Sequence, residues 1–559
     1  MAEGIHDICN NYVAEFAAAH PVEATSLGIP GYDDKLTDYS PDGVAQRAEL
    51  ARRALAKVNA AEPADDSERV AKAVFTERVG LTLELHEANL DLAQLNNIAS
   101  PAHEIRMVFD LMPRRTADDW RAVAERLKAV PGALAGYRAS LLTAVDRGQR
   151  PALRQVAKVA EQCEVWAGLH GSDGFFQQLT SSAADASLDE SLRRELEQHS
   201  TAAQEAYAEF AGFLRAELAP LARSTDAVGA EEYALWSRLF LGSSLDLREA
   251  YEWGWHEFAE LEREMKEVGQ RIKPGASLAE VAAALDADPR YQVTGRDAFQ
   301  DWMQRHSDEA VSALQGKHFE IPEELTRLEC LIAPPGGAVG AYYTHPAEDF
   351  SRPGRMWWSI PADREEFSTW RELSVVYHEG VPGHHLQIGT SVYEKSLNRF
   401  QRLLGNTSGL AEGWALYAEL LMRELGFLTD DGNLMGMLDG QLFRAARVIV
   451  DIGMHLELEI PRGTGFHEGE RWTPELGLEF MLTRTITDPD HVRDEIDRYL
   501  GWPGQAPAYK IGERLWLAAR EDARRRAGDA FDVKDFHTKA LRLGGMGLDT
   551  LREQLAALY

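Results

Sequence analysis

The sequence has few cysteines, far fewer basic than acidic residues and no long hydrophobic run. Its three cysteines, Cys9, Cys163 and Cys330, lie far apart and are odd in number. No C-x-x-C pair occurs, which argues against both a disulfide framework and a thiolate zinc site. Lysine and arginine number 59 against 90 acidic residues, so the net charge is −31. That balance argues against nucleic acid and anionic membranes as partners, because both select basic surfaces.

No segment approaches the roughly 18 uninterrupted apolar residues that suggest a transmembrane helix. The N-terminus, "MAEGIHDICNNYVAEFAAAHP", lacks a basic region and carries acids among its apolar positions. This pattern predicts an amphipathic helix and not a signal peptide. We therefore expect a cytoplasmic protein. At 559 residues, with 45% hydrophobic and 27% charged residues, the composition is typical of a large soluble chain.

Apolar residues recur every three or four positions over most of the chain, among many Ala, Leu, Glu and Arg residues. This period predicts a mainly α-helical fold. We expect a helical N-terminal lobe over residues 1–240 and a helical catalytic lobe over residues 241–559, with one continuous body as the alternative. No internal repeat of the length of a solenoid unit occurs.

The helical period stops between Leu325 and Pro361, where the sequence is rich in Gly, Pro and aromatic residues. "RLECLIA" and "RMWWSI" are typical of short strands joined by turns. We expect one small β-sheet there, lying beside a helix formed by "DREEFSTWRELSVVYHEG". The strand "RMWWSI" is a candidate for pairing with an extended peptide.

The end of that predicted helix carries "YHEGVPGHHLQ", which begins like the zinc motif H-E-x-x-H. Pro382 occupies the place of the second histidine, and the next histidines are His384 and His385. On a straight helix both lie too far along the axis from His378 to share an ion with it. Proline and the flanking glycines favour a break, however, and a break allows a later histidine to return to the metal.

A second helix, "SGLAEGWALYAELLMREL", presents Glu412 and Glu419 on one face, because they are seven residues apart. Two histidines from one segment and a glutamate from a later helix form the ligand set of many zinc peptidases. The glutamate after the first histidine, Glu379, is then left as the base. The alternative for Glu412 is a solvated carboxylate near the start of a helix.

Five motifs in the same order resemble a bacterial family catalogued as domain of unknown function 885. They are "YHEGVPGHHLQ", "LAEGWALYAE", "GAYYTHP…SRPG", "RAARVIVDIGMH" and "GWPGQAPAYKIGE". That family is similar in fold to carboxypeptidase Taq-type metallopeptidases. The resemblance implies a mostly helical, two-lobed body around a deep cleft. Matching the Gly-His-x-Leu part of the Taq-type motif implies His384 as the second ligand, with His385 supporting the ligands or facing the substrate.

The segment "RAARVIVDIGMHLE" places four polar residues at helical spacings of three and four: Arg444, Arg447, Asp451 and His455. If this stripe lines a cleft, Arg447 is a candidate to bind a substrate carboxylate, and Asp451 is a candidate to orient an imidazole. The alternative is an intrahelical ladder of ion pairs.

Two further segments carry candidate donors for substrate. "GWPGQAPAYKIGE" displays Gln505, Tyr509 and Lys510 in a loop before a helix, and Tyr342 and Tyr343 follow a Gly-rich turn. Tyrosine and lysine suit a tetrahedral oxyanion or a terminal carboxylate. We take Tyr509 and Tyr343 as catalytic candidates, and Gln505 and Lys510 as substrate-binding candidates. A capped surface turn is the alternative for the first segment.

The prediction is a zinc-dependent hydrolase of amide bonds, of carboxypeptidase or oligopeptidase character. His378, His384 and Glu412 would hold one Zn²⁺, with Glu379 as base and a peptide or small amide as substrate. No convincing G-x-S-x-G elbow, P-loop or Rossmann fingerprint occurs. The alternatives are a metal-free binding protein on a degenerate peptidase cleft and a metal hydrolase of small amides or esters.

Overall fold

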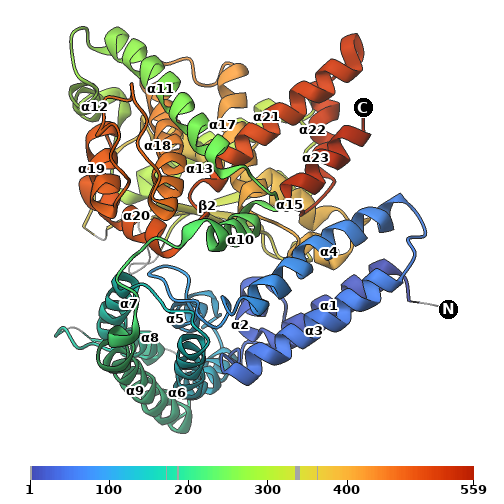
Figure 1. Cartoon of the computed structure of the whole chain (residues 1–559), viewed down its shortest axis with the longest axis vertical. Helices are drawn as coiled ribbons and strands as arrows, with labels where there is room; N and C mark the ends of the chain where they lie inside the picture. Colours follow the sequence, from blue (N-terminus) through green and yellow to red (C-terminus); the bar gives the residue numbers. More distant parts are fainter. Residues whose placement is uncertain (1–2, 172, 186–187, 334–339, 362) are drawn as a thin grey trace. The chain divides into compact units, whose positions relative to one another are not determined.

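The computed structural model describes residues 3–171, 173–185, 188–333, 340–361 and 363–559 (Figure 1). Helices hold 67% of the chain and strands 5%, so the predicted mainly α fold is confirmed. The chain forms two compact units. The first contains residues 1–68, 79–228 and 497–502, and the second contains residues 69–78, 229–496 and 503–559. The predicted lobes and the deep cleft stay predictions.

Within the described part of the chain, eight helices belong wholly to the first unit. They are α1 (Ile5–Ala19), α2 (Pro21–Ser26), α3 (Pro41–Ala60), α5 (Pro101–Leu111), α6 (Ala117–Asp146), α7 (Leu153–Trp166), α8 (Phe175–Ser181) and α9 (Glu190–Phe213). Two more, α4 (Asp66–Glu87) and α20 (Pro489–Gly501), contribute to both units.

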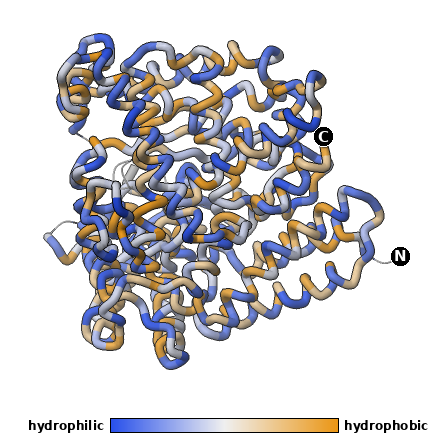
Figure 2. Tube along the Cα trace, turned by 45° about the horizontal axis from the view of Figure 1, so that its top comes forward, coloured by the Kyte–Doolittle hydropathy of each residue, from blue (hydrophilic) through white to orange (hydrophobic). Residues whose placement is uncertain are grey.

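The core of the first unit forms between α6 and α9, whose apolar residues recur at helical spacing (Figure 2). Helix α6 begins at a capping box, in which Thr116 and Asp119 satisfy each other's backbone N–H groups. Two buried tyrosines satisfy their hydroxyls within this core. Tyr137 donates to the Gln94 carbonyl at 2.6 Å and Tyr207 to the Ala102 carbonyl at 2.7 Å.

A buried histidine makes this unit sensitive to acid. His103 Nε2–H donates to Gln162 Oε1 at 2.9 Å, and Nδ1 accepts from the Ser100 hydroxyl at 2.8 Å. Burial lowers the pKa of His103 to about 4, below its ordinary value of 6.5. The folded state therefore resists a proton that the unfolded chain accepts, and stability falls as the pH drops from about 6.5 towards 4.

We expect His103→Gln to remove about 2–3 kcal/mol of the acid-induced loss of unfolding free energy between about pH 7.5 and pH 4.5. Urea titrations of both proteins at the two pH values measure it. His170→Gln is the matched control, because the His170 side chain is 55% exposed. Equal pH dependence in wild type and His103→Gln would contradict the prediction.

The remaining helices belong to the second unit. They are α10 (Gly229–Leu241), α11 (Leu247–Ile272), α12 (Leu278–Asp286), α13 (Arg296–Leu314), α14 (Glu372–Glu379), α15 (His384–Tyr393), α16 (Arg399–Leu403), α17 (Ser408–Glu424), α18 (Asp431–Leu456), α19 (Pro474–Arg484), α21 (Ala508–Ala527), α22 (Val533–Leu541) and α23 (Leu548–Ala557). Helix α18 packs against α11, α17 and α21 (Figure 1).

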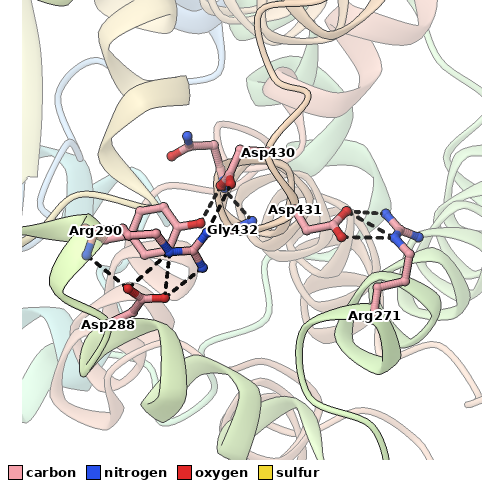
Figure 3. Close-up of polar contacts among 8 residues, drawn as sticks. Arg271, Asp288, Arg290, Asp430, Asp431 and Gly432 are labelled. Carbon is pink, nitrogen blue, oxygen red and sulfur yellow. Dashed lines mark hydrogen bonds and ion pairs between the residues drawn. The ribbon is translucent and has the colours of Figure 1, made fainter.

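Polar contacts fix the start of α18 (Figure 3). Asp430 caps the helix, because its Oδ1 accepts from the Gly432 and Asn433 N–H groups at 3.0 and 3.2 Å. The next residue, Asp431, accepts from Arg271 Nη2 at 2.5 Å, which ties α18 to the end of α11. Tyr291 also donates to Asp430. The start of a helix that carries several candidate site residues is thus held by its neighbours.

Two small sheets occur among the described residues, where the sequence predicted one. Strands β2 (Leu328–Ile332), β4 (Gly354–Ser359) and β3 (Gly340–Thr344) form a mixed sheet in that order, with β4 parallel to β2 and antiparallel to β3. The predicted strands "RLECLIA" and "RMWWSI" are β2 and β4, while residues 334–339 of this segment lie outside the described residues. Because β4 is the central strand, its predicted pairing with a peptide is wrong.

The second sheet pairs β1 (Gln292–Thr294) with β5 (Glu366–Ser368). It shortens the helix predicted from "DREEFSTWRELSVVYHEG". The residues of β5 pair antiparallel with β1, which lies far away in the sequence. Helix α14 therefore begins only at Glu372. The three-stranded sheet lies beside α14 and α15, as predicted. Among the described residues, no helix combines the length and hydrophobicity that crossing a bilayer requires.

Candidate metal centre

The chain breaks between α14 and α15, and this break brings two histidines together. Helix α14 ends at Glu379, the loop 380–383 follows, and α15 begins at His384. Gly383 N–H donates to the Tyr377 carbonyl at 3.0 Å, which turns the chain back on the end of α14. The ring centroids of His378 and His384 are 4.8 Å apart as a result. The break that the sequence predicted at "GVPG" is present.

Two features of the loop make this return possible. A Cβ on Gly383 would lie 1.9 Å from the carbonyl oxygen of His378, so only glycine fits there. The indole N–H of Trp414 donates to the Pro382 carbonyl at 2.7 Å. Trp414 lies on α17, so the loop is anchored to the helix that carries Glu412.

Helix α17 supplies two carboxylates to the histidines. His378 Nε2 lies 3.2 Å from Glu412 Oε2, and His384 Nε2 lies 3.5 Å from the same oxygen. His378 Nδ1–H donates to Glu419 Oε1 at 2.7 Å. The interval of seven residues places both glutamates on one face of α17, as the sequence predicted.

These distances fit a tetrahedral metal site. Ligand atoms about 2.0–2.1 Å from a Zn²⁺ ion lie about 3.3 Å from one another in a tetrahedron. The separations of 3.2 and 3.5 Å between the histidine nitrogens and Glu412 Oε2 lie close to that value. Glu379 also has a carboxylate oxygen within 4.8 Å of ligand atoms of His378 and His384. The donor set of imidazole nitrogen and carboxylate oxygen is one that zinc accepts.

Buried polar atoms without hydrogen-bond partners gather at the same place. Among the described residues they include Glu379 Oε2, His384 Nδ1 and Glu419 Oε2. Leaving a buried polar atom unpaired costs about 1–3 kcal/mol, so such atoms call for an explanation. A metal ion bound between these side chains would provide one. Within the cluster, Glu412 is more exposed than His378, with 21% of its side chain accessible against 4%.

The charges of the cluster are strongly coupled. Burial lowers the pKa of His378, but hydrogen bonds to Glu412 and Glu419 outweigh it and raise that pKa to about 9. Burial raises the pKa of Glu412, whereas the neighbouring His384 and His378 hold it well below its ordinary value. Burial raises the pKa of Glu379. The cluster thus combines an ionised carboxylate beside two imidazoles with a second carboxyl group that holds a proton more readily.

His385 does not face a substrate, which corrects one of the predicted alternatives. Its Nε2 donates to the Leu325 carbonyl at 3.0 Å, so Nδ1 must accept from the Tyr343 hydroxyl, also at 3.0 Å. The side chain is fully buried, and burial lowers the pKa of His385 to about 4. The neutral ring links α15 to the loop before β2 and to strand β3. The proton of Tyr343 is engaged in this contact, so the structure does not support Tyr343 as an oxyanion donor.

Lys510 and Arg447, both predicted to bind substrate, have carboxylate partners instead. Lys510 is 2% exposed and donates to Gln441 Oε1 at 2.6 Å, to Glu257 and to Glu513. Burial lowers the pKa of Lys510, but the charges of Glu513 and Glu257 outweigh it and raise that pKa. Arg447 Nη2 donates to Glu495 Oε2 at 2.7 Å. Both cations are compensated within the fold.

Three more candidates come from the segments "GWPGQAPAYKIGE" and "RAARVIVDIGMHLE". Gln505 is 5% exposed, so the surface-turn alternative for its segment is wrong as well. Tyr509 is half-buried, with its ring 4.7 Å from the Arg447 guanidinium. Asp451 accepts from the Tyr233 hydroxyl at 2.5 Å and from the Gly504 N–H at 2.9 Å. The ladder of ion pairs along α18 stays a prediction, and Arg447 also pairs with Glu495 on α20.

Glu419 is the residue to which the sequence assigned no role. It was placed on the face of Glu412 by its spacing, and the structure shows it accepting from His378. A histidine that binds a metal usually donates its other N–H to a carboxylate or carbonyl. The interval of seven residues was therefore the available signal, but which of the two glutamates meets which nitrogen depends on the packing of α14 against α17.

The chain belongs to the family described as "Bacterial protein of unknown function (DUF885)", whose model matches residues 21–555. None of the curated proteins matches this sequence. A solved structure of a "putative lipoprotein" from Colwellia psychrerythraea is 23% identical, with a TM-score of 0.85 and coverage of 99% of this chain and 98% of that one. A "putative lipoprotein of unknown function" from Shewanella oneidensis is 17% identical, with a TM-score of 0.73 and coverage of 99% of both chains. These likenesses establish a shared fold, and the predicted cytoplasmic location stays a prediction.

Proposed function

We propose that this protein is a zinc-dependent hydrolase of amide bonds that acts on peptides. The observation that carries the proposal is the convergence of His378 Nε2 and His384 Nε2 on Glu412 Oε2, at 3.2 and 3.5 Å. The match to the Gly-His-x-Leu part of the Taq-type motif supports His384 as the second ligand, and the resemblance suggests carboxypeptidase or oligopeptidase character. His378, His384 and Glu412 would hold one Zn²⁺ ion.

Each residue of the cluster has a chemical task in this proposal. A Zn²⁺ ion held there would polarise the scissile carbonyl and make a nearby water more acidic. Glu379 takes a proton from the attacking water and returns it to the leaving amine. Glu419 fixes the ring of His378 with Nδ1 protonated, which leaves Nε2 as the ligand atom. Tyr509 remains the candidate donor to the oxyanion, since no hydrogen bond among the described residues engages its hydroxyl.

Zinc titration and a peptide digest test the proposal together. We expect one tightly bound Zn²⁺ per chain, and cleavage of a mixed peptide library that stops with a chelator and returns with zinc. Absence of zinc binding would favour a metal-free binding protein. Zinc binding without peptide cleavage, but with hydrolysis of small amides or esters, would favour the third function predicted from the sequence. Either result would contradict the peptidase proposal.

Replacing Glu419 by Gln tests the support of the ligand. The amide keeps the size of the side chain but loses the charge that holds His378 Nδ1–H. We expect zinc affinity to fall about 10–100-fold, the usual effect of losing such a partner. Competition with a fluorescent chelator measures it. Glu424→Gln is the matched control on the same helix, because Glu424 pairs with Arg520 at 2.9 Å, away from the cluster, and it should bind zinc normally. Unchanged zinc affinity in Glu419→Gln would contradict the assigned role.

A further inference from the structure

An arginine on α18, Arg444, makes no direct contact with a carboxylate among the described residues, although its charge lowers the pKa values of Glu379 and Asp439, which burial raises. Arg444 Nε is buried without a hydrogen-bond partner, and among the described residues no hydrogen bond or ion pair involves the guanidinium. Its guanidinium lies 6.0 Å from the centre of the Tyr509 ring. A buried or half-buried cation is costly to leave unpaired. In a chain with a net charge of −31, an arginine without a carboxylate partner requires an explanation.

Three neighbouring cations each have a carboxylate partner within the chain. One helical turn further along α18, Arg447 pairs with Glu495 at 2.7 Å. Lys510, at the start of α21, lies between Glu513 and Glu257. One to two turns before Arg444 on α18, Asp439 pairs with Arg371 at 2.8 Å. Arg444 is the exception among these four, so its partner is expected to come from outside the chain.

The guanidinium is also well placed for the reaction. A Cβ on Gly440 would lie 2.7 Å from Arg444 Nη1, so the side chain extends back along α18 over the turn that precedes it. Helix α18 packs against α14, which carries Glu379, and against α21. The Arg444 charge reaches the Glu379 carboxyl, where it opposes the rise in pKa that burial causes.

We propose that Arg444 binds a carboxylate group of the substrate beside the scissile bond. This inference rests on the proposed function and defines its substrate class as peptides with a carboxylate near the cleaved amide. A guanidinium binds a carboxylate through two parallel N–H···O bonds, which positions as well as attracts it. The carboxylate comes either from the C-terminus of the peptide or from an acidic side chain. The chemistry of recognition is the same for both.

Binding to the zinc-loaded Glu379→Gln protein tests the proposal without turnover. The probes are an N-acetylated peptide library with free C-termini and the same library amidated, each prepared with and without Asp and Glu. We expect free acids to bind about 10–100-fold more tightly than their amides, as expected for hydrogen bonds to a charged group. Preference for acidic side chains in both C-terminal forms would instead identify the side chain as the source.

Arg444→Gln in the same background should remove the preference and leave zinc affinity unchanged, while Arg444→Lys should keep a part of it. Arg263→Gln, an exposed arginine on α11 (side chain 58% exposed), is the matched control and should bind like the parent. A Glu379→Gln protein that shows no preference for carboxylates overturns the proposal, and so does a preference that survives in Arg444→Gln. Binding is measured separately from hydrolysis, so the two proposals can fail independently. If only the peptidase function is wrong, the protein binds carboxylates through Arg444 but cleaves no peptide.

Discussion

Glu379→Gln is expected to lower turnover about 10²–10⁴-fold, the usual range for loss of a general base, while zinc stays bound. Glutamine keeps the shape of the side chain but has no basic oxygen. Glu379 immediately follows a candidate ligand, so on α14 it points about 100° away from His378 and reaches the attacking water without holding the ion. Steady-state rates on a cleaved peptide and zinc content by atomic absorption measure the two quantities separately.

Glu379 has a carboxylate oxygen within 4.8 Å of ligand atoms of both histidines. Glu379 and Glu412 could therefore exchange the roles of base and metal ligand. In that case Glu379 would be the third ligand and Glu412 the base. A pair of variants separates the two. Our assignment requires Glu412→Gln to lose zinc and Glu379→Gln to keep it. The reverse pattern would exchange their roles, and unchanged turnover in Glu379→Gln would remove the residue from the reaction.

Gly383→Ala should weaken zinc binding by at least the 10–100-fold that follows the loss of a ligand's supporting contact. The added Cβ would lie 1.9 Å from the His378 carbonyl oxygen and 2.4 Å from that of Tyr377. Both obstacles are backbone atoms, so the loop must move, and it carries the start of α15 with it. His384 then leaves Glu412, although no ligand has been replaced. Isothermal titration with zinc measures the change.

Two controls show whether Gly383→Ala acts through the site. Gly132→Ala adds the same methyl group to α6, where nothing lies within 4 Å of the new Cβ, and should leave zinc binding unaltered. Far-UV circular dichroism should give the same helix content for Gly383→Ala as for wild type. The informative result is the shift in melting temperature on adding zinc, which is large in wild type and small in the variant. An equal shift in both would contradict the return of the chain at this loop.

The sequence correctly predicted those features of the fold that depend on residues close together in the chain. The helical period, the strands β2 and β4 and the break before His384 all follow from residues within a few positions of each other. The order of strands depends on distant segments, which is why β4 was not recognised as central. Glu257 as a partner of Lys510 and Glu495 as the partner of Arg447 were missed for the same reason, because both come from other helices. The spacing of Glu412 and Glu419 put both on the right face, but could not assign each to a nitrogen.

Helix α17 holds Glu412, Trp414 and Glu419 on one rigid stretch of backbone, which affects how mutations that change chain length would act. A single residue inserted between Glu412 and Glu419 would turn one of the two carboxylates by about 100° relative to the other. Either His378 Nδ1–H or the proposed ligand set would lose its carboxylate. An insertion in the loop before Thr407 leaves the interval intact. Descendants of this gene can therefore vary in length around the helix, but the register within it is restricted.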